Sequence, residues 1–186
     1  GDIDDLDECN NDCAAPRYVF ITSGNGPNNN GKLGGVEGAD AYCQGLAVAA
    51  ELLGTYKAWL TDGDLSSAPV KRFKSTDFKG WYMRPTKPPT PVARGWTELT
   101  TPFEAMPMDY LHVAITVNEN GVVNSANVWT NTNVDGTQTS PDDHCGNWQL
   151  DLDTKGWAGF AKPDLLNAEW TAKGLYDCHL GLRLYC

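Results

Sequence analysis

The sequence has no run of about 18 apolar residues, the least that a membrane-spanning helix needs, anywhere in its 186 residues. It shows no secretory signal peptide either, so we expect an export signal upstream of Gly1. Cations are scarce, because 14 Lys and Arg stand against 24 Asp and Glu, a net charge of −10. Such an acidic surface repels phosphate backbones and anionic lipids, so nucleic acid and polyanionic glycans are not expected as partners.

Catalytic motifs are also missing. The chain has three histidines: His112, His144 and His179. His112 and His179 lie in expected strands, and we expect them to be packed side chains or to lie on a sheet face. His144 follows Asp143 directly, but no nucleophile motif such as Gly-x-Ser-x-Gly accompanies this pair. We therefore predict that the protein is not an enzyme.

Cysteine is present in an even number, six, in a chain of moderate size. Cytosolic proteins rarely use cysteine in this way, which indicates an oxidising compartment and a protein that is secreted or held on the outer surface of a bacterium. No CxxC pair or Cys/His spacing typical of zinc is present. Six cysteines allow about 15 pairings, and the spacing by itself leaves the pairing open.

Two regions differ in composition. Residues 1–15 are acidic and polar, with Cys9 and Cys13, and read as a linker or as the tail of a small disulfide-rich repeat. Residues 16–186 carry the apolar patterns of one globular domain, long enough for a sizeable core.

The front half of this domain contains the clearest helix signal. Residues 18–22 form an apolar, β-rich run that predicts a buried strand. A helix is expected from Gly34 to about Leu53, with Cys43 on its apolar face. Residues 56–60 alternate like a half-buried strand, and 67–73 fit a short helix with a proline in its first turn.

The second half predicts short strands separated by turns. Residues 84–95 hold four prolines and are expected to form a loop. Residues 118–121 carry a hairpin signal, 128–130 a strand, and 131–169 are expected to be mostly irregular. One or two helices with several short strands and a long loop region make an α+β domain.

Several short motifs resemble, in order, those of the bacterial endostatin-like domain, typified by leptospiral endostatin-like outer-membrane lipoproteins and found in myxobacterial surface proteins. The matching segments are Gly34-Gly35-x-x-Gly38-Ala39-Asp40-Ala41-x-Cys43-Gln44, Tyr56-x-Ala58-Trp59-Leu60, Gly95-Trp96-Thr97-Glu98-Leu99-Thr100, Val128-Trp129-Thr130, Cys145-Gly146-Asn147-Trp148, Trp170-Thr171, Cys178 and Leu184-Tyr185-Cys186. They span residues 17–186. Residues 1–13 resemble the end of a myxobacterial cysteine-rich repeat.

This resemblance implies a C-type-lectin-like fold with nested disulfides. The outer pair would join Cys43 to Cys186, and the inner pair Cys145 to Cys178. Chain entropy gives such loops about 5 and about 4 kcal/mol of stabilisation as an upper figure. Cys9 and Cys13, separated from the rest of their repeat, would pair with each other, pair with another chain or stay unpaired.

The resemblance also implies adhesion, since leptospiral relatives are surface proteins that bind host matrix and serum proteins. True C-type lectins hold Ca²⁺ and sugar through a Glu-Pro-Asn or Gln-Pro-Asp tripeptide and a later Trp-Asn-Asp. This chain has neither tripeptide and carries Glu169-Trp170-Thr171 at the later position. The standard sugar site is therefore not expected.

Other acidic runs are candidates for Ca²⁺, the one cofactor that the sequence suggests. The densest run precedes Cys9 and contains Asp2, Asp4, Asp5 and Asp7. Asp151 and Asp153 begin like a calcium loop, but Lys155 stands where an oxygen ligand belongs. The interpretation that we favour for each run is a solvated acidic loop, and the run before Cys9 is the best calcium candidate among them.

Seven tryptophans are the remaining unusual feature. Trp96, Trp129 and Trp170 lie in family-like motifs beside strands and are predicted to be core residues. Trp148 and Trp157 fall in the long loop region, where exposed tryptophan faces bind sugars or anchor proteins. We predict a ligand surface there, with Asp142, Asp143 and Asn147 around the two rings.

The sequence thus predicts a non-catalytic, adhesin-like binding module that recognises an extracellular protein or glycan. Two alternatives remain open. One is an atypical calcium-dependent lectin. The other is a structural subunit of an extracellular fibre or coat, self-associating through the N-terminal arm.

Overall fold

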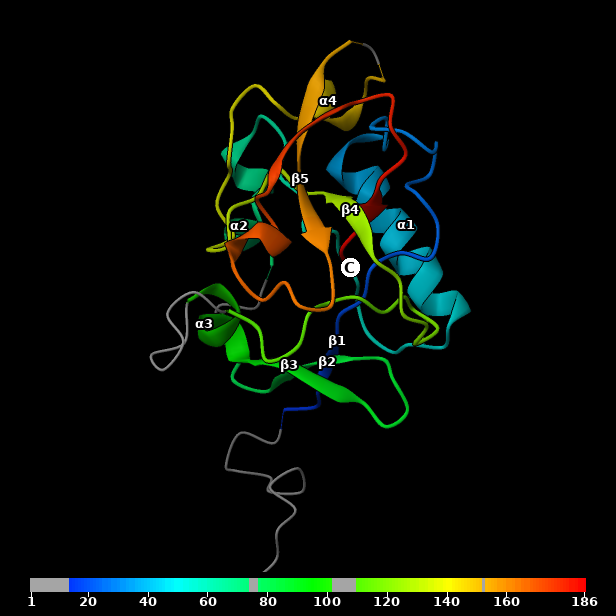
Figure 1. Cartoon of the computed structure of the whole chain (residues 1–186), viewed down its shortest axis with the longest axis vertical. Helices are drawn as coiled ribbons and strands as arrows, with labels where there is room; N and C mark the ends of the chain where they lie inside the picture. Colours follow the sequence, from blue (N-terminus) through cyan, green and yellow to red (C-terminus); the bar gives the residue numbers. More distant parts are fainter. Residues whose placement is uncertain (1–13, 74–76, 102–109, 152) are drawn as a thin grey trace, which may run out of the picture.

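The computed structural model describes residues 14–73, 77–101, 110–151 and 153–186, and in these ranges the fold is α+β, as expected. Two sheets lie at different heights along the long axis (Figure 1). One has three strands in the order β1-β2-β3, and the other has four in the order β6-β5-β4-β7. The predicted boundary near residue 15 falls at the edge of the described chain and stays a prediction.

The three-stranded sheet joins the start of the described chain to its middle. β1 (Arg17–Tyr18) runs parallel to β2 (Trp81–Arg84), which pairs antiparallel with β3 (Thr90–Arg94). A bulge lies between Tyr82 and Met83. The expectation of a loop over 84–95 is therefore wrong for 90–94, because a proline is tolerated in an edge strand that does not need its N–H.

The four-stranded sheet carries the second half of the chain. β4 (Ala126–Trp129) pairs antiparallel with β5 (Lys155–Ala161) and parallel with β7 (Arg183–Leu184). β6 (Gly174–Asp177) forms the other edge, against β5. β5 lies inside the range expected to be mostly irregular. It escaped detection because its glycines and alanines give no β-propensity signal.

The main helix is α1 (Gly35–Ala49), and its buried residues recur on one face at helical spacing. Gly34 precedes it in a left-handed conformation. The helix ends before the expected Leu53, and the next residue but one, Glu51, already has a φ of 58°. Cys43 lies on the buried face, as predicted.

The other helical elements are short, of three to six residues. They are η1 (Leu65–Ser67), α2 (Pro69–Arg72), α3 (Gly95–Thr100), α4 (Cys145–Trp148) and η2 (Ala168–Trp170). α2 confirms the helix expected in 67–73, and its Arg72 makes a 2.6 Å ion pair with Asp40 of α1. The same guanidinium donates to the carbonyls of Ala58 and Leu60, which fixes the extended segment 56–60 against the helix.

Two disulfides and a pair of backbone hydrogen bonds close the chain on itself. Cys43 is bonded to Cys186 and Cys145 to Cys178, so the nested pairing is confirmed. Phe20 and Cys186 exchange both backbone hydrogen bonds, at 3.1 and 2.9 Å. The last described residues therefore lie beside the first strand region.

The buried side chains form two clusters. The first surrounds α1 and both disulfides and includes Trp129 and Trp148. The second lies between α3, η2 and the three-stranded sheet and includes Trp59, Trp96 and Trp170. The predictions that Trp96, Trp129 and Trp170 are core residues are confirmed.

Two histidines differ from expectation. His112 lies outside the strands with its side chain 41% exposed, where Nε2 is 3.1 Å from Glu98. His179 is exposed in the turn that follows β6. Neither is packed in a sheet, because the apolar neighbours that suggested strands, Leu111 and Val113 among them, belong to irregular segments.

Candidate functional site

Part of the predicted long loop region, with α4, lies at the top of Figure 1, whereas the tip of the 131–144 loop lies beside α2, where the carbonyl of Gly136 accepts from the N–H of Val70 at 3.1 Å. The resulting surface runs from that end along one side of the molecule. We call this surface the loop face. It consists of residues 61–64, residues 131–144 and the turn α4 with Gln149, and its outward side chains are mostly polar.

A layer of buried hydroxyl groups supports the loop face from below. Thr61 and Thr132 join their hydroxyls at 2.8 Å, and the Thr171 hydroxyl donates to the carbonyl of Thr132 at 2.7 Å. Thr130 donates to the carbonyl of Thr171 at 2.6 Å. All four threonines are fully buried, at 0% exposure. Each hydroxyl therefore lies away from water, where leaving it without a hydrogen-bond partner would be costly.

Side chains also join the loops of this face to one another. The amide of Gln138 donates to the carbonyl of Asp62, and the N–H of Gly63 donates to Asn147 Oδ1 at 2.9 Å. Asn131 donates to the carbonyl of Ser140 at 2.8 Å and accepts from its N–H at 3.0 Å. The three loops are therefore held in one arrangement.

The turn α4 is left-handed. Its four residues, Cys145 to Trp148, have φ values of 51° to 57°. Such a conformation costs a non-glycine residue about 1–2 kcal/mol. The disulfide from Cys145 and the buried ring of Trp148 hold the turn in place from both ends.

His144 caps this turn rather than pairing with Asp143. Its Nδ1 accepts a hydrogen bond from the N–H of Asn147 at 2.8 Å, and Nε2 lies 2.8 Å from the carbonyl of Pro141. With Nδ1 accepting, the neutral ring carries its proton on Nε2 and donates to that carbonyl. The Asp143 carboxylate instead accepts from the Ser140 hydroxyl at 2.8 Å.

Trp148 is not a surface residue, and its predicted role as a ligand anchor is wrong. It is 0% exposed, its ring packs against Trp129, and its Nε1 donates to the carbonyl of Thr61 at 2.9 Å. The left-handed turn is the cause, because it directs this side chain inward while Asn147 stays exposed. Position in a loop was therefore a poor guide to exposure.

The other predicted ligand residues remain accessible. Trp157 is half-buried on β5. Its backbone N–H donates to the carbonyl of Asp143, so the strand lies next to the loop face. Asp142 and Asn147 are exposed, and Asp143 is half-buried. Their accessibility is compatible with ligand binding, which stays a prediction for these four residues.

Sequence reasoning missed three further acidic residues of this face: Asp62, Asp64 and Asp135. Asp64 caps η1 by accepting from the N–H of Ser66 at 2.8 Å, and this backbone bond lowers the pKa of its carboxyl. Asp135 accepts from both the N–H and the hydroxyl of Thr137. The Asp-Gly pairs at 62–63 and 135–136 are turn signals that place aspartates at loop tips.

The calcium candidates do not gather. Asp151 and Asp153 are exposed, and Asp151 accepts from Asn30 at 3.1 Å. Within the described ranges, no three His, Cys, Asp or Glu side chains lie close enough together to hold a metal ion. Asp2, Asp4, Asp5, Asp7, Cys9 and Cys13 lie outside the described residues, so those predictions stand as they were made.

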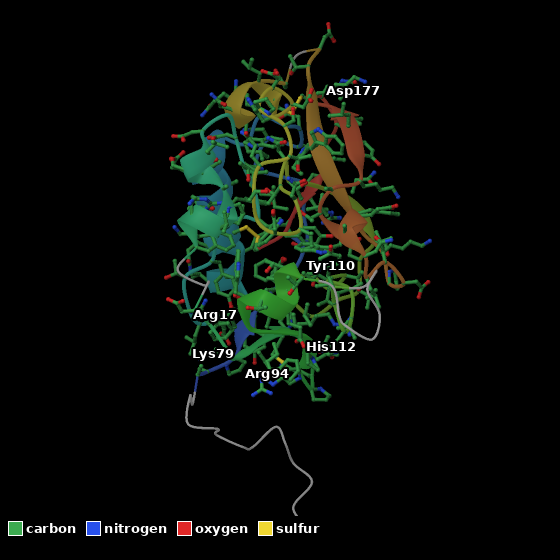
Figure 2. All side chains as sticks on the ribbon, turned by 90° about the vertical axis from the view of Figure 1, so that its left-hand side faces the viewer. Arg17, Lys79, Arg94, Tyr110, His112 and Asp177 are labelled. Carbon is green, nitrogen blue, oxygen red and sulfur yellow. A yellow bond between two sulfur atoms is a disulfide. The ribbon has the colours of Figure 1, made fainter. Side chains whose placement is uncertain are left out.

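The end of the molecule opposite α4 carries cations. Figure 2 shows Arg17, Lys79 and Arg94 near the three-stranded sheet, away from the loop face. All three are exposed, and the Arg17 guanidinium lies 4.0 Å from the centre of the Phe78 ring. These three exposed cations therefore lie on a different part of the molecule from the aspartates of the loop face.

Comparison with known proteins gives a family but no activity. No helix in the described part of the chain has the length and apolarity to cross a membrane. A search of curated proteins found no match. The profile of DUF1554, a family of proteins of unknown function, matches residues 26–163, which include α1, the loop face and the strands β4 and β5. The chain belongs to the DUF1554 family.

Proposed function

We propose that this protein is a non-catalytic, exported recognition module that binds a macromolecular ligand, protein or glycan, through the loop face. The observation that carries this proposal is the rigid construction of that face. Side-chain hydrogen bonds join its three loops, and a disulfide fixes the turn α4, whose Asn147 is exposed. A surface that is ordered before binding loses less conformational entropy when a ligand arrives.

A C-type-lectin-like, endostatin-like fold is part of the same proposal. The nested disulfides support it, as does the pairing of the Phe20 segment with the last described residues. The long loop region between β4 and β5 also supports it, since ligand surfaces commonly lie on loops that a rigid scaffold positions.

Charge indicates the kind of ligand. Asp62, Asp64, Asp135, Asp142 and Asp143 all belong to the loop face. Their carboxylates favour a partner that presents lysine or arginine side chains, and electrostatic attraction would speed the encounter. The disulfides and the acidic composition support export, and we propose the outer surface of a bacterium or the extracellular medium as its location.

Two alternatives remain. One is an atypical calcium-dependent lectin, for which carboxylates are the right ligand type, although no three His, Cys, Asp or Glu side chains of the described ranges gather around one point. The other is a structural subunit, since the exposed Arg17, Lys79 and Arg94 lie away from the aspartates of the loop face, and cations of one copy can meet carboxylates of the next head to tail. The N-terminal arm, the other proposed route to self-association, lies outside the described residues.

An array of immobilised glycans and matrix proteins distinguishes these functions. The full chain would be applied once with Ca²⁺ and once with EDTA. We expect binding to proteins or glycans that EDTA leaves unchanged. Glycan binding that EDTA abolishes would establish the calcium-dependent lectin instead. A blank array, together with association of the chain on a sizing column, would support the structural subunit.

A further inference from the structure

The four-stranded sheet ends in a strand whose outer edge is open. β6 pairs with β5 on one side, and no strand of the described ranges pairs with its other side. Leu175 and Asp177 are exposed, and Figure 2 shows Asp177 at the outer margin of the molecule. An unpaired strand edge is a place where a further strand can add to a sheet.

The hydrogen bonds of β5 show which groups of β6 face outward. Trp157 of β5 directs both backbone groups away from β6, because its N–H donates to the carbonyl of Asp143 and its carbonyl accepts from the N–H of Thr130. Leu175 of β6 lies opposite Trp157. In an antiparallel pair, opposite residues that do not bond to each other both direct their N–H and C=O groups outward. Leu175 therefore presents a donor and an acceptor at the edge, and neither bonds to another segment of the described chain.

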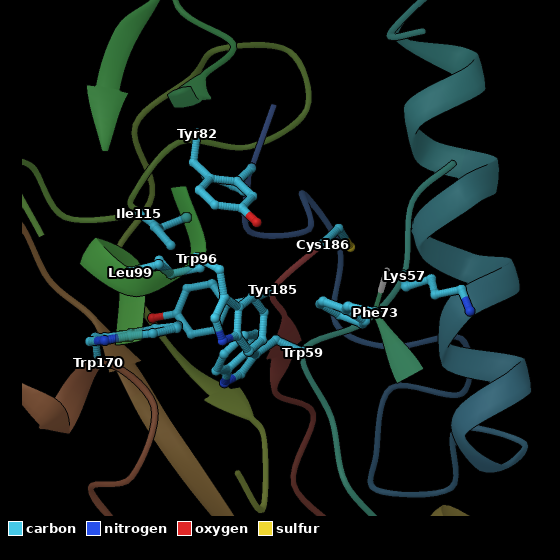
Figure 3. Close-up of a pocket in the computed structure, with 11 residues that line it drawn as sticks. Lys57, Trp59, Phe73, Tyr82, Trp96, Leu99, Ile115, Trp170, Tyr185 and Cys186 are labelled. Carbon is cyan, nitrogen blue, oxygen red and sulfur yellow. The ribbon is translucent and has the colours of Figure 1, made fainter. Parts of the chain in front are cut away.

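The strand is held in place from both ends. Before it, Trp170 packs against Trp59 and Tyr185 in the second cluster of buried side chains, with ring centroids 5.2 and 5.4 Å apart (Figure 3). After it, Cys178 is joined to Cys145 by a disulfide. The edge is therefore formed before any partner arrives, which lowers the entropy that pairing costs.

The charges along this edge are complementary to themselves. If two copies pair antiparallel with their Leu175 residues opposite each other, Lys173 of each copy lies opposite Asp177 of the other. The three side chains share one face of the sheet, because side chains alternate along a strand. Cross-strand pairs of opposite charge stabilise a sheet, and like charges directly opposite each other destabilise it. A second copy of this chain therefore fits the edge in this register.

Neither charge is held tightly within one chain. Lys173 lies 3.9 Å from Glu169 and 4.2 Å from the centre of the Phe160 ring. Asp177 lies 3.6 Å from Lys155, and both side chains of this pair are exposed. Exposed ion pairs of this kind contribute little to stability, so Lys173 and Asp177 can turn towards a second copy at small cost.

The other face of β6 fits the same pairing. In this register Gly174 of each copy lies opposite Tyr176 of the other. A Cβ on Gly174 would meet nothing within 4 Å, so the tyrosine ring has space to cover the glycine. Packing of an aromatic ring over a cross-strand glycine stabilises an edge.

We propose that β6 is an interface between two copies of this chain, related by a two-fold axis at the Leu175 pair, so that their four-stranded sheets join into one. Two backbone hydrogen bonds link the Leu175 residues, and the Lys173–Asp177 pair occurs twice, as two-fold symmetry requires. The strand has four residues, so the interface is smaller than the usual area of about 1,600 Å² and the association is weak. The interface uses no residue of the loop face and is independent of ligand binding there.

Sedimentation equilibrium of the full chain, from about 20 µM to about 1 mM, tests this proposal. We expect a monomer–dimer equilibrium. Lys173→Asp and Asp177→Lys each set like charges opposite each other and should weaken association roughly tenfold, because the pair occurs twice. The variant with both changes has opposite charges again and should recover association. Lys71→Asp, at an exposed position on α2, is the matched control and should associate like the natural chain.

Amide hydrogen exchange places the contact. The N–H of Leu175 should exchange about twofold more slowly once half of the chains are paired, whereas amides away from β6 should not change. If the variants do not fold, exchange at Leu175 of the natural chain decides. The proposal is overturned if the chain stays monomeric at about 1 mM, if the single variants associate like the natural chain, if the folded double variant does not recover, or if dimers form without protecting Leu175.

Discussion

At the scale of single residues, Trp148 and Trp157 differ in burial, although the sequence predicted that both line one ligand surface. Trp148 is enclosed and bonded through Nε1, whereas Trp157 is half-buried on a strand. We expect Trp148→Ala to lower the free energy of unfolding by about 3–5 kcal/mol, because it removes a large core side chain. Trp157→Ala should cost about 1 kcal/mol. Denaturant titration of both variants measures this, and equal losses would contradict the burial described for Trp148.

Also at the scale of single residues, ionisation of a buried tyrosine should lower the stability of the fold at alkaline pH. Burial, and to a smaller extent the neighbouring Tyr18, raises the pKa of Tyr56 from 10.0 to about 12. The neutral phenol therefore stabilises the fold fully below pH 10, and this contribution is lost as the pH rises from 10 towards 12.

Tyr56→Phe should remove part of that pH dependence. The variant cannot ionise at this position, so its unfolding free energy should fall less steeply above pH 10 than that of the natural chain. Tyr185, whose pKa burial also raises, remains in both proteins and serves as a common background. Parallel curves from pH 8 to 12 would show that Tyr56 does not contribute.

At the scale of elements, two glycines of α1 test how the helix is packed. A Cβ on Gly38 would lie 2.2 Å from the carbonyl oxygen of Leu33, whereas a Cβ on Gly45 would meet nothing within 4 Å. Gly45→Ala should therefore stabilise the protein by about 0.5–1 kcal/mol through helix propensity. Gly38→Ala should destabilise it, because the backbone before the helix must move. Thermal unfolding of the two variants checks this, and a stabilising Gly38→Ala would be inconsistent with the close contact.

The helices and strands also show which parts of the fold could be predicted from the sequence. The helix α1 could be predicted because its apolar spacing is visible within one short segment. The disulfides could be predicted because the order of the cysteines resembles that of a known family. β5 was missed because glycine and alanine carry no strand signal, and its place is set by pairing with β4 and β6. The inward direction of Trp148 was missed because it depends on the left-handed turn, whose φ values of 51° to 57° leave no signal in the sequence and which the Cys145–Cys178 disulfide helps to hold.

At the scale of the whole molecule, the proposed recognition surface and the first described residues lie apart. The chain enters the described fold at β1, near Arg17, Lys79 and Arg94, and α4 of the loop face lies towards the other end of the long axis (Figures 1 and 2). The loop face is therefore clear of the first described residues. Its attraction for a cationic partner should weaken as salt is added, since exposed charges are screened within about 8–10 Å.

The most direct test of recognition by the loop face is a comparison of two charge-matched variants on the array of glycans and matrix proteins. One carries Asp135→Lys and Asp142→Lys on the loop face. The other carries Glu51→Lys and Asp164→Lys, at exposed positions outside it. We expect the first variant to bind its array ligands roughly tenfold more weakly, since each exposed ion pair contributes up to about 1 kcal/mol. The second should bind like the natural chain. Equal binding by both variants would contradict recognition through the loop face.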